Sequence, residues 1–219
     1  MKLENKVKIY QASNFYYTIG LLATDGCVYS DLKRISFTSK DYEQVINVSK
    51  CLGIKSKIGE NISGNKKSLT YRIQMVDKDL VEYLLSIGIG PNKSKTISRI
   101  KIPKKYFFDF LRGCFDGDGS IYSYYDKRWK SSFMFYLSFA SASPNFISWI
   151  RKEIKEKLDI IGHVTTAKGA NTIQLKYAKN DSIKIIYKMY YAENVMCLTR
   201  KKLKVYRILD IVKHSKHGW

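Results

Sequence analysis

Residues 111–119 read LRGCFDGDG, and residues 18–26 read TIGLLATDG. Both stretches place a glycine, then apolar residues, and then an Asp-Gly pair at the same spacing, with Asp25 and Asp118 as the aspartates. A pattern that returns along a chain indicates repeated structural units. We therefore expect two similar halves, each built around one copy.

The sequence that follows each copy also repeats. Alternating runs end at residues 37–39 and 139–141, and further runs at 68–75 and 172–177 alternate apolar with polar residues. This alternation is typical of strands with one face on a core and one polar face. Helical sequence then follows, at residues 79–87, 181–191 and 204–212. The pattern predicts an α+β fold with two pseudo-symmetric αββαββα halves.

Helix starts and the join between the halves can also be located. Asp41 and Gln44 form a capping-box pattern, and Ser143 followed by Pro144 supplies an N-cap and a first-turn proline. The halves are assigned to residues 1–98 and 99–212, with a basic C-terminal tail at 213–219. Pro103 interrupts the chain close to the join.

The composition indicates a polyanionic partner. Among 219 residues, Lys and Arg number 39 against 19 Asp and Glu, which gives a formal net charge of +20. Together with an aromatic content of 14%, this excess favours nucleic acid over the alternatives, a lysine-rich surface or an anionic membrane.

Several other classes are disfavoured. No apolar run reaches the roughly 18 residues of a membrane span, and the N-terminus lacks the apolar region of a secretory signal. The four cysteines form no C-x-x-C pair, so a zinc site is not expected. The prediction is an intracellular protein, cytoplasmic (in the nucleoid) or organellar, with no membrane partner.

The two Asp-Gly ends point to a metal. An aspartate at a helix C-terminus opposes the helix dipole, and the carbonyl groups beside it lack helical partners. Oxygen donors of this kind suit Mg²⁺. Gly26 and Gly119 are expected to cap the helices. Gly20 and Gly113 would let the two helices touch, bringing the aspartates together on a pseudo-twofold axis.

The two stretches resemble the paired motifs of the LAGLIDADG homing endonucleases, and the repeat extends this resemblance over nearly the whole chain. The second copy is the closer match and keeps Asp116 as well as Asp118. The first copy has Thr18 in place of the leading Leu and Ala23 in place of the earlier acidic residue, but it keeps Asp25.

The resemblance implies a monomeric, two-motif endonuclease with saddle-shaped antiparallel sheets, known as the homing-endonuclease fold. Such a hydrolase binds a long double-stranded DNA target and cuts both strands across the minor groove, in the service of intron homing. The metal ligands would be the carboxylates of Asp25 and Asp118, helped by the backbone oxygens of Thr24 and Gly117. Mg²⁺ is the expected ion, with Mn²⁺ or Ca²⁺ able to replace it for binding.

The family also places basic or polar residues around the metal centre. Lys93 and Lys201, late in each half, are candidates to orient water and stabilise the phosphate, and Ser39 and Ser141 are weaker candidates at matching strand ends. The alternative for all four is a solvated surface residue.

DNA-reading residues are expected on the polar strand faces, because a two-stranded ribbon fits the major groove. The remaining lysines would contact phosphates. The candidate readers are Tyr29, Lys33, Arg34, Ser36, Ser39, Thr70, Arg72, Gln74, Tyr122, Tyr124, Arg128, Tyr136, Ser138, Ser141, Gln174 and Lys176.

Two other functions fit the same scaffold. One is an RNA maturase that helps an intron fold, and the other is a DNA-binding regulator that does not cut. Loss of the acidic pair would favour either, but both aspartates are present.

Overall fold

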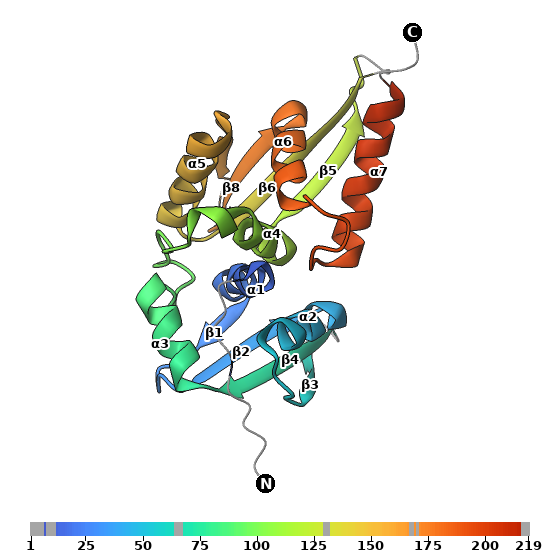
Figure 1. The fold of residues 1–219 in the computed structure, drawn as a ribbon. Helices are drawn as coiled ribbons and strands as arrows, with labels where there is room; N and C mark the ends of the chain where they lie inside the picture. Colours follow the sequence, from blue (N-terminus) through green and yellow to red (C-terminus); the bar gives the residue numbers. More distant parts are fainter. Residues whose placement is uncertain are drawn as a thin grey trace.

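The computed structural model describes residues 7, 12–63, 68–128, 132–166, 169 and 171–215. Their fold is α+β and consists of two halves with the same order of elements (Figure 1). The N-terminal half contains α1 (Ser13–Thr24), β1 (Gly26–Val28), β2 (Arg34–Ser39), α2 (Tyr42–Leu52), β3 (Ile58–Ser63), β4 (Ser68–Val76) and α3 (Lys78–Ile87). The C-terminal half contains the short helix η1 (Lys104–Tyr106), α4 (Phe107–Asp118), β5 (Ser120–Tyr125), β6 (Phe133–Ser141), α5 (Pro144–Leu158), β7 (His163–Thr166), β8 (Ile173–Ala178), α6 (Lys179–Met189) and α7 (Thr199–Ser215).

Each half holds a four-stranded antiparallel sheet of the same topology. The strand orders are β1-β2-β4-β3 and β5-β6-β8-β7, so the second half repeats the first. The registers also correspond, with Ser36 opposite Gln74 in one sheet and Ser138 opposite Lys176 in the other. The predicted fold class is confirmed, and α7 is an additional helix at the end of the second half.

Strand alternation sorts the side chains of each sheet between two faces. Phe37 and Ile73 in the first sheet, and Leu137 and Leu175 in the second, are fully buried against helices. The intervening residues lie on the opposite face, which we call the open face of each sheet. The period-two pattern thus places the core on one side and leaves polar residues on the other.

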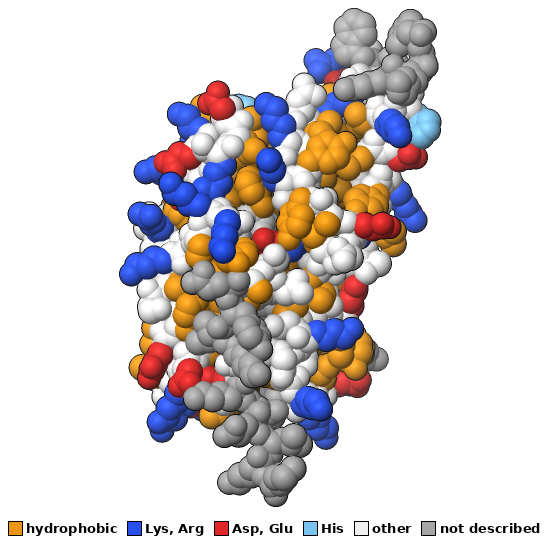
Figure 2. All heavy atoms as spheres, viewed as in Figure 1, with side chains coloured by type: hydrophobic (Ala, Val, Ile, Leu, Met, Phe, Trp, Pro, Cys, Tyr) orange, Lys and Arg blue, Asp and Glu red, His pale blue; other side chains and the backbone are white. Residues whose placement is uncertain are grey.

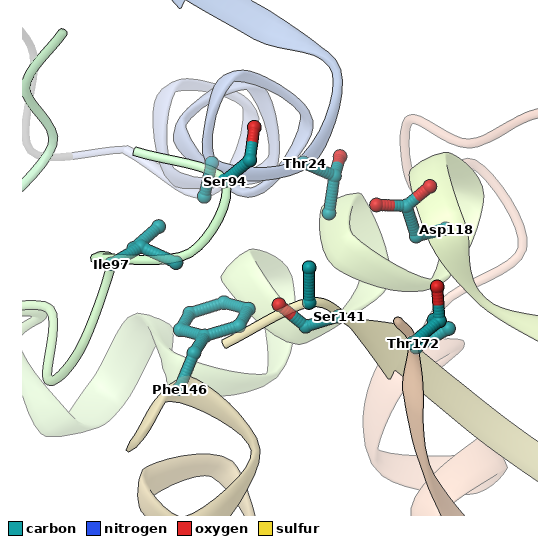
Figure 3. A pocket seen from close by; sticks show the side chains of 10 residues that line it. Thr24, Ser94, Ile97, Asp118, Ser141, Phe146 and Thr172 are labelled. Atoms are coloured by element: carbon teal, nitrogen blue, oxygen red, sulfur yellow. The ribbon is translucent and has the colours of Figure 1, made fainter. Parts of the chain in front are cut away.

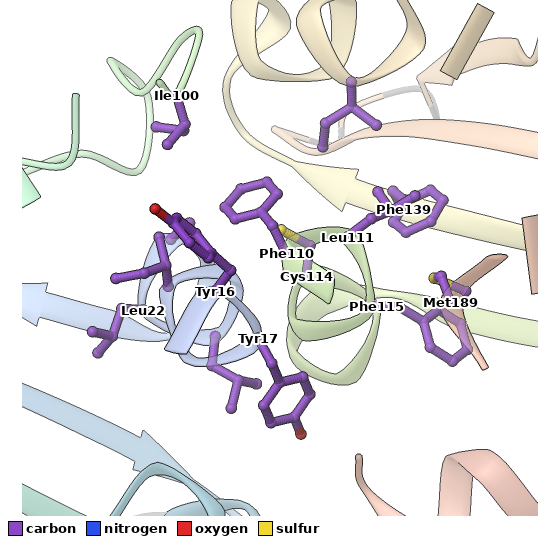
Figure 4. Close-up of a cluster of buried hydrophobic side chains, with 14 of the residues drawn as sticks. Tyr16, Tyr17, Leu22, Ile100, Phe110, Leu111, Cys114, Phe115, Phe139 and Met189 are labelled. Carbon is purple, nitrogen blue, oxygen red and sulfur yellow. The ribbon is translucent and has the colours of Figure 1, made fainter. Parts of the chain in front are cut away.

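Helices α1 and α4 cross between the two sheets (Figure 1). They touch at Gly20 and Gly113, where a Cβ atom on Gly20 would lie 2.1 Å from the Phe110 carbonyl oxygen. A Cβ atom on Gly113 would lie 2.0 Å from the Tyr17 carbonyl oxygen. Only glycine permits this contact, as predicted. Around the crossing, aromatic and aliphatic side chains of both halves merge into one apolar core (Figure 4).

The predicted helix starts have different outcomes. Ser143 caps α5 by accepting a hydrogen bond from the Phe146 amide at 3.4 Å, and Pro144 is the first residue of the helix, as expected. The capping box at Asp41 is wrong, because the Asp41 side chain makes no cap hydrogen bond. Gln44 instead accepts a hydrogen bond from the Ser39 hydroxyl at 2.7 Å.

The glycines of the Asp-Gly pairs also have different outcomes. Gly119 is the C-cap of α4, as expected, and its amide donates to the Cys114 carbonyl oxygen at 3.2 Å, although its backbone is extended (φ −79°, ψ 159°). Gly26 is not the expected cap, because the C-cap of α1 is Asp25 and Gly26 begins strand β1. Each glycine is required because a Cβ atom would lie 2.6 Å from the last turn of the preceding helix. Lysines bond the carbonyl groups at both helix ends.

The C-terminal helix is longer than predicted. Helix α7 runs from Thr199 to Ser215, so it includes the first three residues of the predicted tail, and residues 216–219 lie outside the described part. None of the described helices is long and apolar enough to cross a membrane.

Candidate active site and DNA surface

The two motif aspartates lie at neighbouring helix ends. Asp25 follows the last residue of α1, and Asp118 is the last residue of α4. Gly117 of α4 faces the end of α1, because a Cβ atom on Gly117 would lie 2.1 Å from Thr24 Oγ1 and 2.9 Å from Asp25 Oδ2. The crossing thus brings the two acidic groups to one place, and the small Gly117 leaves room for the Asp25 carboxylate.

Two buried lysines bond the carbonyl groups at these helix ends. The Lys201 ammonium donates to the carbonyl oxygens of Gly117 at 3.0 Å and Gly119 at 2.7 Å, which flank Asp118. The Lys93 ammonium donates to the carbonyl oxygens of Thr24 at 3.3 Å and of Gly26, which flank Asp25. The two lysines therefore occupy pseudo-equivalent positions. Each cation lies at the negative end of a helix dipole.

The charges of this cluster perturb one another. Burial, and then the negative charge of Asp118, raise the pKa of Asp25 to about 6. Although Asp118 is exposed at the surface, the protein packed around it raises its carboxyl pKa as well. Burial lowers the pKa of Lys201 to about 8, and it also lowers the pKa of Lys93. As residues only 7% and 8% exposed, Lys93 and Lys201 are not the solvated surface residues of the alternative interpretation.

A pocket opens beside Asp118 (Figure 3). Thr24, Ser94 and Ser141 line it together with Asp118, and Phe146 closes its apolar side. Most of the remaining lining residues are small, which leaves polar hydroxyl groups around an acidic side chain. Ser141 is thus near the site, while Ser39 at the matching strand end bonds Gln44.

On the open face of the first sheet, the predicted DNA readers form a cationic group. The guanidinium groups of Arg34 and Arg72 lie over the Tyr29 ring, at 4.7 and 5.9 Å from its centroid. Thr70 and Gln74 lie on the same face of β4. Lys33 precedes β2 in the connecting loop.

On the open face of the second sheet, the corresponding group is aromatic. The rings of Tyr122 and Tyr136 stack with centroids 5.3 Å apart, and Tyr124 stacks on Tyr136 at 6.4 Å. Gln174 and Lys176 complete this face on β8. The sequence identified these tyrosines only one by one. Tyr122 and Tyr124 are two residues apart and so lie on the same face of a strand, and this spacing could have predicted that they stack on one neighbouring ring.

Three of the remaining candidate DNA readers are not exposed on the open sheet faces. Ser36 and Ser138 are buried, and the Ser138 hydroxyl lies 2.7 Å from the Ser120 hydroxyl. Arg128 lies in the loop after β5 and pairs with Asp126. On the face of the molecule shown in Figure 2, many Lys and Arg side chains lie on the α5 side of the C-terminal half.

Sequence reasoning missed a buried polar network behind the site. Asp116 accepts hydrogen bonds from the Tyr17 hydroxyl at 2.9 Å and from the Leu198 amide at 2.7 Å. Arg112, whose side chain is fully buried, pairs with Asp109 at 2.8 Å. An arginine and an aspartate within an apolar helix were the available signal, because such groups are buried only with partners.

Comparison with known proteins supports the predicted resemblance. Residues 14–88 match the family model described as a LAGLIDADG-like domain. No curated protein matches the chain in sequence.

Solved structures match the chain along most of its length. The I-LtrWI LAGLIDADG homing endonuclease bound to target DNA has a TM-score of 0.61 and 11% identity, covering 94% of this chain and 92% of that one. I-DmoI in complex with DNA and Mn has a TM-score of 0.53 and 15% identity, covering 83% and 98%. Full-length DUF199/WhiA from Thermotoga maritima has a TM-score of 0.60 and 18% identity, covering 94% of this chain, which spans 62% of that protein's length. At these identities the likeness establishes the fold.

Proposed function

We propose that this chain, which carries a LAGLIDADG-like domain over residues 14–88 and has the homing-endonuclease fold, is a site-specific DNA endonuclease. It would hydrolyse one phosphodiester bond in each strand of a long double-stranded target. One observation carries the proposal: two aspartates and two buried lysines meet at the adjacent ends of α1 and α4, between two sheets with polar open faces.

The acidic pair fits a divalent cation. Asp25 and Asp118 raise the electrostatic cost of each other's ionisation, and a positive ion between them would relieve it. These two carboxylates would hold Mg²⁺, helped by the carbonyl oxygens of Thr24 and Gly117, each of which retains a lone pair beside its lysine bond. When bound, the ion supplies Lewis acidity and a more acidic water. The structural neighbour solved with DNA and Mn supports this assignment.

The lysines would act on the phosphate. Lys93 and Lys201 hold positive charge within the protein beside the carboxylates, and both are fixed by backbone carbonyls. Fixed charges in a partly buried site stabilise negative charge that develops on a phosphate oxygen more effectively than mobile ones in water.

The open faces would read the target. Arg34 and Arg72 in the first half can donate to guanine edges, and Tyr124, Tyr136 and Lys176 in the second half offer ring and polar contacts. Asp25 and Asp118 lie in one chain, so one copy of the protein would act on both DNA strands. We therefore infer that a monomer acts on DNA, in the cytoplasm (nucleoid) or an organelle, as in intron homing.

A cleavage selection on a randomised DNA library in Mg²⁺ tests the proposal and recovers the target. Asp25→Asn and Asp118→Asn should each reduce cutting by at least about 100-fold. Binding of the same duplex in Ca²⁺ should stay intact in gel-shift assays. Asp210→Asn, which removes an exposed carboxylate on α7, is the matched control and should cut normally.

The outcomes separate the alternatives. Recovery of a duplex that the wild-type protein binds but does not cut in Mg²⁺ or Mn²⁺ would favour a DNA-binding regulator. Preferential binding to a folded intron RNA, with rescue of splicing, would favour a maturase.

A further inference from the structure

Lys201 belongs to the C-terminal half, but the segment that carries it is held by the N-terminal half. Three residues of this segment, Cys197, Thr199 and Arg200, bond α2 or its N-cap residue Asp41. The Cys197 carbonyl accepts from the Asn47 amide at 3.0 Å, and the Thr199 amide donates to the Glu43 carboxylate at 3.1 Å. Arg200 forms a two-pronged ion pair with Asp41, with both bonds at 2.7 Å.

The residues between these contacts bond α4. Arg112 donates to the Met196 carbonyl at 2.8 Å, and Asp116 accepts from the Leu198 amide at 2.7 Å. Tyr17 of α1 bonds the same Asp116 oxygen. Each residue from 196 to 201 therefore has an anchor. Cys197, Thr199 and Arg200 are held by the N-terminal half, whereas Met196, Leu198 and Lys201 are held by α4 and the residue that follows it. We call residues 196–201 the anchored segment.

The first turn of α7 supports this placement. Glu43 and Asp41 lie at the beginning of α7, where amide groups lack helical partners and the dipole is positive. Their carboxylates therefore fix the helix start from which the Lys201 side chain reaches the Asp118 site. Asp41 performs this role instead of capping α2.

The pseudo-equivalent segment in the first half is held differently. Ile97 is buried, and its carbonyl oxygen accepts a hydrogen bond from Ser143 at the start of α5. Within the described part of the chain, no ion pair joins residues 88–97, which include the equivalents of residues 196–201, to the other half. Ala23, at the position equivalent to Asp116, has no carboxylate to bond that segment. The two lysines are thus positioned by chemically different means.

We infer that Asp41, Glu43 and Arg200 are positioning residues for Lys201, and that through it they set the rate of cutting of one DNA strand. This inference rests on the proposed function. The pair of Asp41 and Arg200 lies at the surface, with side chains 23% and 62% exposed, so breaking it should leave the protein folded. Loss of the anchor should displace Lys201 while Lys93 keeps its place. Displacement of the Lys201 ammonium group is expected to slow cutting of the affected strand on the order of tenfold.

The test uses a supercoiled plasmid that carries the duplex recovered by the selection. Arg200→Ala and Asp41→Ala should each accumulate nicked plasmid before linear product, with the slow strand the same in both and with binding affinity unchanged. The swapped pair Asp41→Arg with Arg200→Asp should restore linear product. Glu156→Ala, which also removes one partner of an exposed ion pair, should resemble the wild type.

A second measurement reports on Lys201 without cleavage. Brief treatment with acetic anhydride, followed by mass spectrometry, measures how accessible each lysine is. Arg200→Ala should raise acetylation of Lys201 several-fold relative to Lys93. Equal slowing of both strands, or unchanged acetylation of Lys201, would overturn the inference. If the wild-type protein binds the duplex without cutting, the proposed function fails, and with it the effect on strand cutting. The acetylation ratio then still decides whether Asp41, Glu43 and Arg200 position Lys201.

Discussion

Gly20 and Gly113 fix how closely the two halves approach. Because the atoms nearest to a Cβ on Gly20 belong to the α4 backbone, they cannot rotate away as a side chain could. The separation of the two motif helices therefore depends on two missing side chains.

We predict that Gly20→Ala destabilises the protein. A methyl group 2.1 Å from a backbone oxygen forces the helices apart, and overpacking of this kind typically costs about 1–3 kcal/mol. Gly90→Ala is the control, because its Cβ would meet only a leucine methyl at 3.5 Å. Urea denaturation should show a lower midpoint for Gly20→Ala alone, and equal midpoints would refute the argument.

Gly117 has a more local function, because it faces Thr24 and Asp25. We predict that Gly117→Ala displaces the Asp25 carboxylate and reduces cutting on the order of 100-fold, while binding of the duplex in Ca²⁺ persists. Adding Thr24→Ala removes the hydroxyl that lies 2.1 Å from the new methyl and should recover part of the activity. A Gly117→Ala protein with full activity would show that the carboxylate does not need this space.

At the scale of elements, the two open sheet faces differ. The first combines Arg34 and Arg72 with one tyrosine, and the second stacks three tyrosines, of which Tyr122 and Tyr124 are 40% and 43% exposed. Arginine suits guanine edges, while aromatic rings suit apolar contact with thymine methyl groups. The two halves of a target should therefore differ in base composition.

We predict that Tyr136→Ala weakens DNA binding by about 1–2 kcal/mol and relaxes specificity only in the half of the target that contacts the second sheet. Repeating the library selection with the variant measures this. Tyr125→Ala is the control, since Tyr125 is on the same pair of strands but packs toward Phe133 on the other face. Relaxed specificity in both halves would contradict the assignment.

The helices and strands show where local sequence was sufficient to predict the structure. Alternation and the repeated motif located both sheets and the crossing, and Ser143 was identified as a cap because its hydrogen bond is local. Asp41 was misassigned because its partner, Arg200, is far away in the sequence. Helix α7 was placed too late for the same reason, since its start is held by Glu43. Lys93 and Lys201 were named from their matching places in the repeat, whereas their bonds to the helix ends depend on tertiary structure.

At the scale of the whole molecule, charge should dominate affinity. With a formal net charge of +20, binding to duplex DNA should release many counterions. We predict that the logarithm of the binding constant falls with the logarithm of salt concentration with a slope of about −6 or steeper. Fluorescence anisotropy at several salt concentrations gives the slope. A shallow slope, near zero, would argue against a DNA partner.

The same titration tests individual residues. Loss of a phosphate contact lowers the magnitude of the slope by about one, whereas loss of a base contact weakens binding at unchanged slope. Arg72→Ala should follow the second pattern if Arg72 reads bases as proposed.

The backbone contact between α1 and α4 has a final consequence, because helices packed this closely are expected to resist sliding and pivoting of one half on the other. The distance and angle between the two DNA-binding sheet faces would then be fixed. Since B-DNA completes a turn in about 10–10.5 base pairs, one extra pair at the target's centre rotates the outer segments by roughly 35° against each other. We do not expect the crossing to follow that rotation. Insertion or deletion of a base pair at the centre of the target should therefore weaken recognition as much as base substitutions near its ends.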